Sequence, residues 1–347
     1  MSPPVKQILV VGPSWVGDMV MAQSLFMTLQ QTYPNADIDV LAPAWSKPIL
    51  ERMPEIRSAI VQAVGHGEFA LLSRYRLGKK LRQQAYDVAV ILPRSFKSAL
   101  VPFFARIPNR IGYKGEMRYG LLNDIRPLDK SVLKQTVQRF VALGVLENAK
   151  LPPAIPEPRL SIDKENQQRL IKELELSLGR PVVGFMPGAE YGPAKRWPEA
   201  NFAGVADYLI DNGYQVWLMG SDKDRIFADT IQQAAKQSLV NLCGKTKLKD
   251  VVDLMAVMQF AVTNDSGLMH VAAAVGCKLI AIYGSSTPSY TPPLTSQAKI
   301  LYEGLSCSPC FERECPLGHT QCLTLISVDK VIAAVRDITS SETSTTG

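Results

Sequence analysis

The 347-residue sequence contains no long hydrophobic run, and this absence excludes one class of protein at once. No stretch approaches the roughly 18–20 apolar residues that a membrane-spanning helix needs. The first residues, MSPPVKQILVVG, also have too short an apolar stretch for a signal peptide. We therefore expect a cytoplasmic protein whose six cysteines lie in a reducing compartment, where structural disulfides are rare.

The sequence also lacks the short motifs of common nucleotide-binding proteins. The stretch GPSWVGD at 12–18 is neither G-x-G-x-x-G nor a Walker loop with Gly-Lys-Ser/Thr. No nucleic-acid-binding motif is present either, so we expect no nucleic-acid partner. Hydrophobic residues make up 46% of the chain and charged residues 20%, a composition that excludes a disordered protein.

Short apolar strands alternate with amphipathic helices along two separate halves of the chain. The proline-rich segment LENAKLPPAIPEPRLSID at 146–163 interrupts the pattern and has the composition of a linker. Because such alternation implies right-handed βαβ units and parallel sheets, we predict an α/β fold with two Rossmann-like domains that face each other across a cleft. The predicted strands cover 7–11, 38–41, 58–64, 87–92, 182–186, 215–219, 260–263 and 279–283. The predicted helices cover 19–31, 69–84, 95–104, 131–143 (with Ser131 as a cap), 199–211, 222–235, 249–258, 267–275 and 328–338.

We assign residues 1–155 to an amino-terminal domain and residues 156–327 to a carboxy-terminal domain. The last helix, at 328–338, could pack on either domain, and the low-complexity residues 339–347 are expected to be disordered. Ligands of open α/β sheets bind at the carboxyl ends of the strands. We therefore expect functional residues in the loops that follow the strands.

Basic residues concentrate between Arg74 and Arg118, where eleven lysines and arginines are opposed only by Asp87 and Glu116. Such an excess is typical either of a solvated helix face or of a surface for an anionic partner. Aromatic residues interleave only weakly with the cations. An acidic lipid or a phosphorylated substrate therefore fits this tract better than nucleic acid.

The first of three notable loops joins the strand at 7–11 to the following helix. Gly12 and Gly17 permit a tight turn, and the helix start behind them offers free amides to an anion. Asp18 stands where an anion-binding loop would favour positive charge. It is either a helix cap or a general base that takes a proton from a substrate hydroxyl.

The second loop, PGAEYGPAKRWP at 187–198, follows the strand at 182–186. Gly188 and Gly192 make it flexible, and Lys195 and Arg196 place two cations near its end. Fixed cations beside a helix start can stabilise the charge of a leaving diphosphate. A solvated basic turn is the alternative.

The third loop lies within TNDSGLMHVAAAVG at 263–276. The amides of Ser266, Gly267 and Leu268 open a helix without intrahelical partners and could cradle a phosphate. His270 follows in the first helical turn, either as a structural residue or beside the ligand. A further phosphate or sugar contact is possible in the loop after 279–283, which supplies Ser285, Ser286 and Thr287.

Four cysteines near the carboxyl end read C-x2-C-x4-C-x6-C, with His319 in the last interval. The first pair has zinc-ligand spacing, but a second C-x-x-C is absent. A structural zinc site and a compact loop of reduced thiols therefore both remain open. We expect no catalytic metal, because the cations and helix starts already supply what a metal would do for a diphosphate. The four residues are Cys307, Cys310, Cys315 and Cys322.

Three segments, in this order, resemble those of the ADP-heptose:lipopolysaccharide heptosyltransferases: GPSWVGD at 12–18, GAEYGPAKRWP at 188–198 and NDSGLMH at 264–270. The resemblance runs from about residue 7 to residue 338, and the first two segments are most similar to the heptosyltransferase II branch. It implies the two-domain glycosyltransferase fold called GT-B, with the acceptor on the first domain and the donor on the second. It also implies an inverting, metal-independent transfer of L-glycero-D-manno-heptose from ADP-heptose to the first heptose of the lipopolysaccharide inner core, without a cofactor.

The same resemblance implies roles for individual residues. Asp18 matches a base for the acceptor hydroxyl, and Lys195 matches a lysine that contacts the donor phosphates and sugar. Asp265 and His270 match residues beside the donor heptose. The remaining donor-binding positions are Gly188, the turn Ser266, Gly267 and Leu268, and a ribose-binding acid at Asp222 or Asp224.

The implied acceptor is a lipid A–Kdo–heptose molecule at the inner membrane surface. We expect a monomer held by charge on the cytoplasmic face of that membrane, without a spanning helix. Three alternatives stay open: heptosyltransferase I or III, another GT-B nucleotide-sugar enzyme such as an epimerase, and a non-catalytic scaffold. The candidate acceptor-binding residues are Arg94, Lys97, Arg110 and Lys114.

Overall fold

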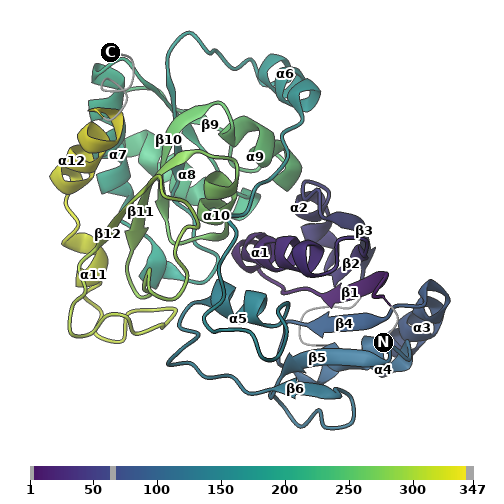
Figure 1. Cartoon of the computed structure of the whole chain (residues 1–347). Coiled ribbons are helices and arrows are strands. Elements are labelled where there is room, and N and C mark those ends of the chain that lie inside the picture. The colour runs from purple at the N-terminus through teal and green to yellow at the C-terminus, as the bar shows by residue number, and fades with distance from the viewer. Residues whose placement is uncertain (1–3, 63–67, 341–347) are drawn as a thin grey trace. The chain divides into compact units, whose positions relative to one another are not determined.

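A computed structural model describes residues 4–62 and 68–340 of the chain. The chain forms two compact units, Met1–Pro158 and Arg159–Gly347 (Figure 1). Each unit is built on a six-stranded parallel sheet, which confirms the prediction of two Rossmann-like α/β domains. The boundary at 155/156, the cleft and the roles assigned to the two halves stay predictions. Within the described ranges, every helix is too short or too polar to cross a bilayer.

The first sheet has the strand order β3-β2-β1-β4-β5-β6, and all its neighbouring pairs are parallel. Residues Ile8–Val11 of β1 are all buried, as expected for a central strand that is covered on both faces. The order reverses between β1 and β4, so the loops after these two strands meet at the switch point where such folds bind ligands. The strands are β1 (Gln7–Val11), β2 (Asp37–Ala42), β3 (Ile56–Val61), β4 (Val88–Ile91), β5 (Asn109–Tyr113) and β6 (Asp124–Arg126).

Of the four helices predicted in the first unit, the first is longer than expected, at Val16–Thr32 against 19–31, whereas the other three are shorter. The backbone N–H and the hydroxyl of Ser131 donate to Asp129 Oδ1 at 2.8 and 2.5 Å, so Ser131 belongs to a turn and caps no helix. The helix expected from residue 131 begins at Thr136, with Gln135 as its N-cap. The helices are α1 (Val16–Thr32), α2 (Lys47–Leu50), α3 (Leu71–Leu81), α4 (Leu100–Phe104) and α5 (Thr136–Ala142).

The second sheet repeats the strand order of the first, as β12-β11-β10-β7-β8-β9, again with parallel pairs only. Its switch point lies between β7 and β10. The loops predicted to carry donor chemistry follow these two strands and the neighbouring β11. The strands are β7 (Val182–Met186), β8 (Gln215–Leu218), β9 (Val240–Asn241), β10 (Met258–Asn264), β11 (Lys278–Tyr283) and β12 (Ala298–Tyr302).

The last helix, α12, packs on the second unit. Val331, Ala334 and Val335 are buried in the same core as Phe202 of α7 and Ile280 of β11. It ends at Ser340, two residues beyond the predicted end. The rest of the expected tail, 341–347, and the end of the strand expected at 58–64, residues 63–64, lie outside the described residues. The helices of this unit are α6 (Lys164–Glu173), α7 (Glu199–Asp211), α8 (Arg225–Ala234), α9 (Leu248–Met255), α10 (Gly267–Ala274), α11 (Gln321–Thr324) and α12 (Val328–Ser340).

Candidate active site

Asn264, the last residue of β10, holds both ends of the lysine-bearing loop in the second unit. Its side chain is fully buried. Nδ2 donates to the carbonyl of Pro187 at 2.7 Å, and Oδ1 accepts the backbone N–H of Trp197 at 3.0 Å. Since β7 and β10 are hydrogen-bonded neighbours, one amide side chain at the switch point fixes where the segment 187–197 begins and ends.

A lysine, a carboxylate and a hydroxyl from three different loops meet beside this amide. Lys195 Nζ lies 2.5 Å from Asp265 Oδ2, and Ser286 Oγ donates to the same oxygen at 2.5 Å. The Lys195 ammonium also lies 5.1 Å from the centre of the Tyr191 ring. Only 17% of the lysine side chain and 5% of the carboxylate are exposed. The site therefore presents a positioned, largely dehydrated cation whose remaining N–H donors can meet an anion.

Unpartnered polar atoms gather around the start of α10. Ser266 is the N-cap residue of this helix, but its side chain makes no capping bond. Within the described part of the chain, the buried atoms Ser266 Oγ, Ser285 Oγ and His270 Nδ1 have no hydrogen-bond partner. Buried polar atoms are nearly always paired in folded proteins. Together with the free amides at the helix start, these atoms indicate a ligand site with several polar groups.

The imidazole of His270 is held in its neutral form. Its side chain is buried, and burial lowers its pKa to about 4; the neighbouring ammonium of Lys195 lowers it further, while Asp265 opposes the shift. Near neutral pH the ring can donate one hydrogen bond and accept another, but it adds no positive charge. The charge offered to an anion in this cluster comes from Lys195.

The two candidate ribose-binding acids differ in their surroundings. Asp222 has an 80% exposed side chain and pairs with Arg225 at 2.9 Å. Asp224 is half-buried and accepts hydrogen bonds from the backbone N–H and hydroxyl of Ser221 at 2.8 and 2.7 Å. Its carboxylate lies against Gly188, where an added Cβ would come within 2.2 Å of Oδ1. The structure thus brings Asp224, and not Asp222, to the lysine-bearing loop.

In the first unit, Asp18 lies at the carboxyl end of β1 as predicted, but it is not the helix cap. α1 begins at Val16 with Trp15 as its N-cap, so the carboxylate belongs to the first turn of the helix. Gly12 fits close packing, because a Cβ there would lie 2.8 Å from Met19 Cε. Asp18 is half-buried. Of the two interpretations open at the sequence level, the N-cap role is therefore wrong.

Some arginines of the basic tract stabilise the fold. Arg118 is 2% exposed and donates to the carbonyls of Pro93 and Tyr113 at 2.7 and 2.6 Å. Burial lowers its pKa to about 10, and the nearby Arg94 contributes. Arg74 is also buried, and its Nε donates to the carbonyl of Phe69 at 2.8 Å. These two cations hold loops in place and offer little to a partner.

The four candidate acceptor-binding residues fall into two groups. Arg110 donates to the carbonyls of Leu121 and Ile107 at 2.6 and 2.5 Å, so its guanidinium already has structural bonds. Arg94 and Lys114 are exposed, and Lys97 is half-buried. The turns that carry Arg94 and Lys114 touch, since a Cβ on Gly115 would lie 2.2 Å from the carbonyl oxygen of Arg94. Arg94 and Lys114 thus lie on neighbouring turns, at the carboxyl ends of β4 and β5.

The four cysteines predicted as a cluster line one pocket, together with His319. All four are free thiols. Among residues 4–62 and 68–340, no group of three or more His, Cys, Asp or Glu side chains is arranged to hold a metal ion, so the zinc alternative gains no support. Backbone N–H groups of the turn at 317–320, Thr320 first, lower the pKa of Cys315. Burial first, and then the other three thiols, raise the pKa of Cys322.

The cysteine-bearing loop supports the lysine-bearing loop, a contact that the sequence analysis missed. The N–H of Ala194 donates to the carbonyl of Arg313 at 3.0 Å, and the hydroxyl of Tyr191 donates to the carbonyl of Phe311 at 2.5 Å. The guanidinium of Arg313 lies 5.4 Å from the centre of the Tyr191 ring. About 120 residues separate the two loops, and no sequence motif in either loop predicts that they are in contact.

Comparisons with known proteins show which family the chain resembles. The profile of glycosyltransferase family 9 (heptosyltransferase) matches residues 74–321. The chain is 47% identical to lipopolysaccharide heptosyltransferase 2 of Salmonella typhimurium, over 97% of this chain and 99% of the relative. It is 52% identical to lipooligosaccharide heptosyltransferase 2 of Haemophilus influenzae, over 85% of this chain and 88% of the relative.

A solved structure of E. coli ADP-heptose lps heptosyltransferase II superposes with a TM-score of 0.86 at 44% identity, over 97% of this chain and 99% of that one. This similarity confirms the GT-B glycosyltransferase fold that the sequence predicted. The profile match covers most of the chain, and the relatives match it over nearly their whole length. The chain therefore belongs to glycosyltransferase family 9, the heptosyltransferases.

Proposed function

We propose that the second unit binds ADP-heptose, with the diphosphate at the start of α10 and beside Lys195. The observation that carries this proposal is the cluster at the switch point of β7 and β10. There, a positioned ammonium lies beside three buried polar atoms without partners. Asp224 is the proposed ribose ligand, because its carboxylate contacts Gly188 of the same loop. The names of the relatives, heptosyltransferase 2 and ADP-heptose lps heptosyltransferase II, support this donor.

In the proposed reaction, Asp18 is the general base. Its carboxylate takes the proton of an acceptor hydroxyl, and the hydroxyl oxygen forms a bond to the anomeric carbon of heptose from the face opposite the diphosphate. The bond between that carbon and the phosphate oxygen breaks, so ADP leaves with the electron pair and the configuration inverts. Lys195 and the amides of Gly267 and Leu268 stabilise the charge that develops on the leaving diphosphate. No metal takes part in this scheme.

The proposed acceptor is the first heptose of a lipid A–Kdo–heptose molecule, as in heptosyltransferase II. Arg94, Lys97 and Lys114 are proposed to bind its acidic groups, whereas Arg110 is a weaker candidate because its guanidinium has structural bonds. The identities of 47–52% to proteins named heptosyltransferase 2 favour this step over addition of the first or third heptose. We further propose a monomer that is peripheral on the cytoplasmic face of the inner membrane.

A transfer assay with ADP-heptose tests the donor and the acceptor together. We expect transfer to a core acceptor that carries one heptose and none to an acceptor that carries no heptose. Transfer to the heptose-free acceptor would instead assign the first addition step. In a panel of nucleotide sugars, only ADP-heptose should compete with ADP for binding. Competition by a uridine nucleotide sugar would favour another GT-B activity.

Replacement of Asp18 tests the assignment of the base. Asp18→Asn keeps the size of the side chain but cannot accept the proton, so we expect kcat to fall by about 10²–10⁴-fold. ADP affinity should stay within about twofold, because the proposed donor-binding residues lie in the other unit. Glu51→Gln is a matched control from the same unit, since this exposed carboxylate pairs with the exposed Lys47 at 3.5 Å. Wild-type turnover by Asp18→Asn would assign the base elsewhere.

A further inference from the structure

We propose that α3 and α4 of the first unit form a docking surface for an anionic lipid bilayer. Large apolar side chains and cations are exposed together on these two helices and on the residues beside them. We call this set the α3–α4 face. Its apolar members are Phe69, Leu71, Leu72, Tyr75 and Phe103. Its basic members are Arg76, Lys79, Lys80 and Arg106.

The packing of α3 decides which of its residues point outward. Gly78 presses against α4, where an added Cβ would lie 2.6 Å from Phe104 Cβ, and Leu81 is 6% exposed on the same side. The opposite side therefore points away from the helix pair, which lies side by side in Figure 1. Leu72, 69% exposed, lies there. Arg76 and Lys79 follow it at helical spacings of four and seven residues, so an apolar side chain and two cations share one face.

Aromatic contacts hold the apolar part of the face in place. Tyr75 of α3 packs edge-on against Phe104 of α4 at 5.2 Å between ring centres, and Phe103 lies 5.7 Å from the same ring. Even so, Tyr75 and Phe103 each remain 41% exposed. Phe69 stacks on Phe96 at 6.4 Å and is 50% exposed. Rings and leucines exposed beside lysines and arginines are typical of helices that lie in the interface of a membrane.

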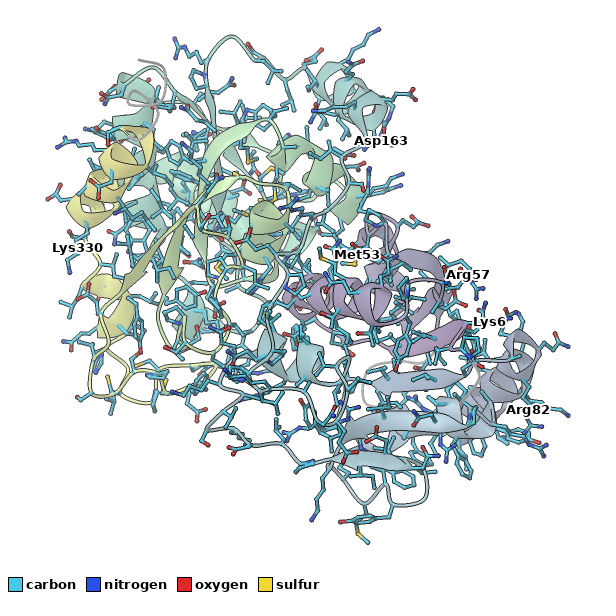
Figure 2. All side chains as sticks on the ribbon, in the orientation of Figure 1. Lys6, Met53, Arg57, Arg82, Asp163 and Lys330 are labelled. Carbon is cyan, nitrogen blue, oxygen red and sulfur yellow. The ribbon has the colours of Figure 1, made fainter. Side chains whose placement is uncertain are left out.

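The charge of the segment is almost entirely positive. Residues 69–106 contain a single acid, Asp87. Its carboxylate accepts the backbone N–H groups of Lys6 and Gln7 at 2.7 and 3.0 Å, at the start of the central strands. Arg82, labelled in Figure 2 at the end of α3, donates to the carbonyl of Phe104 at 2.9 Å. The segment thus offers no carboxylate to neutralise the exposed cations.

A bilayer fits this combination better than a nucleic acid does. Anionic headgroups attract Lys and Arg, and the acyl boundary just below them accepts Leu72, Tyr75 and Phe103. A nucleic acid would pair with the cations but would leave Leu72 in water. The inference deepens the proposed function and rests on its lipid-linked acceptor, but vesicle binding requires neither donor nor acceptor and can be measured by itself.

Vesicle binding of the full-length protein tests the proposal. We expect it to sediment with vesicles of phosphatidylcholine and phosphatidylglycerol much more than with phosphatidylcholine alone. The variant Arg76→Gln/Lys79→Gln/Lys80→Gln should bind the anionic vesicles about a hundredfold more weakly, because each basic residue near such a surface contributes roughly fivefold. Leu72→Ser/Phe103→Ser should also weaken vesicle binding. The remaining binding of this variant should be electrostatic and should be abolished by high salt.

The variant Lys130→Gln/Lys134→Gln/Lys150→Gln is the matched control, since it removes three exposed cations from the same unit outside the face. It should bind like the wild type. Equal losses in the two triple variants would indicate diffuse attraction and overturn the proposal, as would equal binding to both vesicle types or tighter binding to duplex DNA than to anionic vesicles. ADP binding and transfer to a deacylated, soluble acceptor should be unchanged in the face variants. Absence of transfer in every protein would reject the proposed function but not the docking surface.

Discussion

At the scale of single residues, the charge of Lys195 is the feature on which donor chemistry depends. Asp265 fixes the ammonium by an ion pair of 2.5 Å, with 17% and 5% of the two side chains exposed. Such a preorganised cation stabilises developing negative charge without reorganisation. We expect Lys195→Met to lower kcat by about 10²–10³-fold, a loss of the size found when one such charge-stabilising group is removed.

The control for this variant is Lys249→Met, which removes an exposed lysine from α9 of the same unit. Steady-state kinetics with ADP-heptose should give wild-type values for it. If Lys195→Met also gives wild-type kinetic values, the ion pair with Asp265 is structural and Lys195 has no part in the reaction.

His270 gives a residue-scale prediction on pH. Its pKa in the folded protein is about 4, because burial disfavours the imidazolium, against 6.5 for a free imidazole. Between pH 4 and pH 6.5 the unfolded chain binds a proton at His270 more readily than the folded protein does. The unfolding free energy is therefore unaffected by this group above pH 6.5 and decreases as the pH falls toward 4. This one group should lower the unfolding free energy by about 2 kcal/mol between pH 7 and pH 5.

His270→Gln checks the assignment, since it removes this titration. Urea unfolding at the two pH values should show a smaller drop for the variant than for the wild type. In histidine NMR spectra, the resonance that the variant lacks should not shift between pH 8 and pH 5.5. A midpoint near 6.5 for that resonance would contradict a buried, neutral ring.

At the scale of elements, Asn264 determines the position of the lysine-bearing loop. Asn264→Leu removes both bonds of the amide and leaves the Pro187 carbonyl and the Trp197 N–H without partners inside the protein. We expect a loss of about 2–6 kcal/mol in unfolding free energy, since each of the two buried unpaired groups costs about 1–3 kcal/mol. Urea denaturation measures this change.

Asn212→Ala provides the comparison, because its side chain makes one exposed bond to the Tyr208 carbonyl at 2.7 Å. That loss should stay near 0.5–1 kcal/mol. ADP affinity should fall in Asn264→Leu and not in Asn212→Ala. Unchanged affinity in both would show that the loop keeps its position without the amide.

The sequence predicts those elements whose pattern is local and strong. The buried runs of β1 and β7, and the turns at Gly12 and Ser266, are recognisable because apolar strands and helix starts leave a signature within a few residues. β5, β6, β9 and β12 were missed. NRIGY of β5 and AKILY of β12 mix polar and apolar residues without regular alternation, and β6 and β9 are only three and two residues long. Ser131 misled because a helix cap and a turn use the same hydroxyl chemistry.

Many residues of the candidate site could be predicted from the sequence, but the contacts between them could not. Lys195 and Ser286 were identified by their place after a strand, and Asp265 by the resemblance to heptosyltransferases. Lys195 and Ser286 both bind Asp265 Oδ2 because the strand order makes their loops neighbours. This order was not evident from the sequence of any one loop. The support of Tyr191 by the Phe311 carbonyl spans 120 residues and leaves no local trace.

At the scale of the whole molecule, the two units repeat one topology but offer opposite chemistry at their switch points. The first places Asp18 after β1, and the second places Lys195 and the start of α10 after β7 and β10. A doubly wound sheet fixes where a ligand binds, while the loop residues decide which ligand it is. The donor's nucleotide should therefore engage the second unit alone.

Hydrogen exchange with ADP tests this division. We expect slower exchange at 187–197, 264–270 and 284–287, which carry the proposed contacts, and unchanged exchange at 12–18. At ADP concentrations a hundredfold above Kd, amides of the second unit that exchange by unfolding of that unit should slow by about a hundredfold, because binding then contributes about 2.7 kcal/mol. Asp18→Asn should show the same protection and Lys195→Met less of it. Protection at 12–18 would instead assign part of the nucleotide site to the first unit.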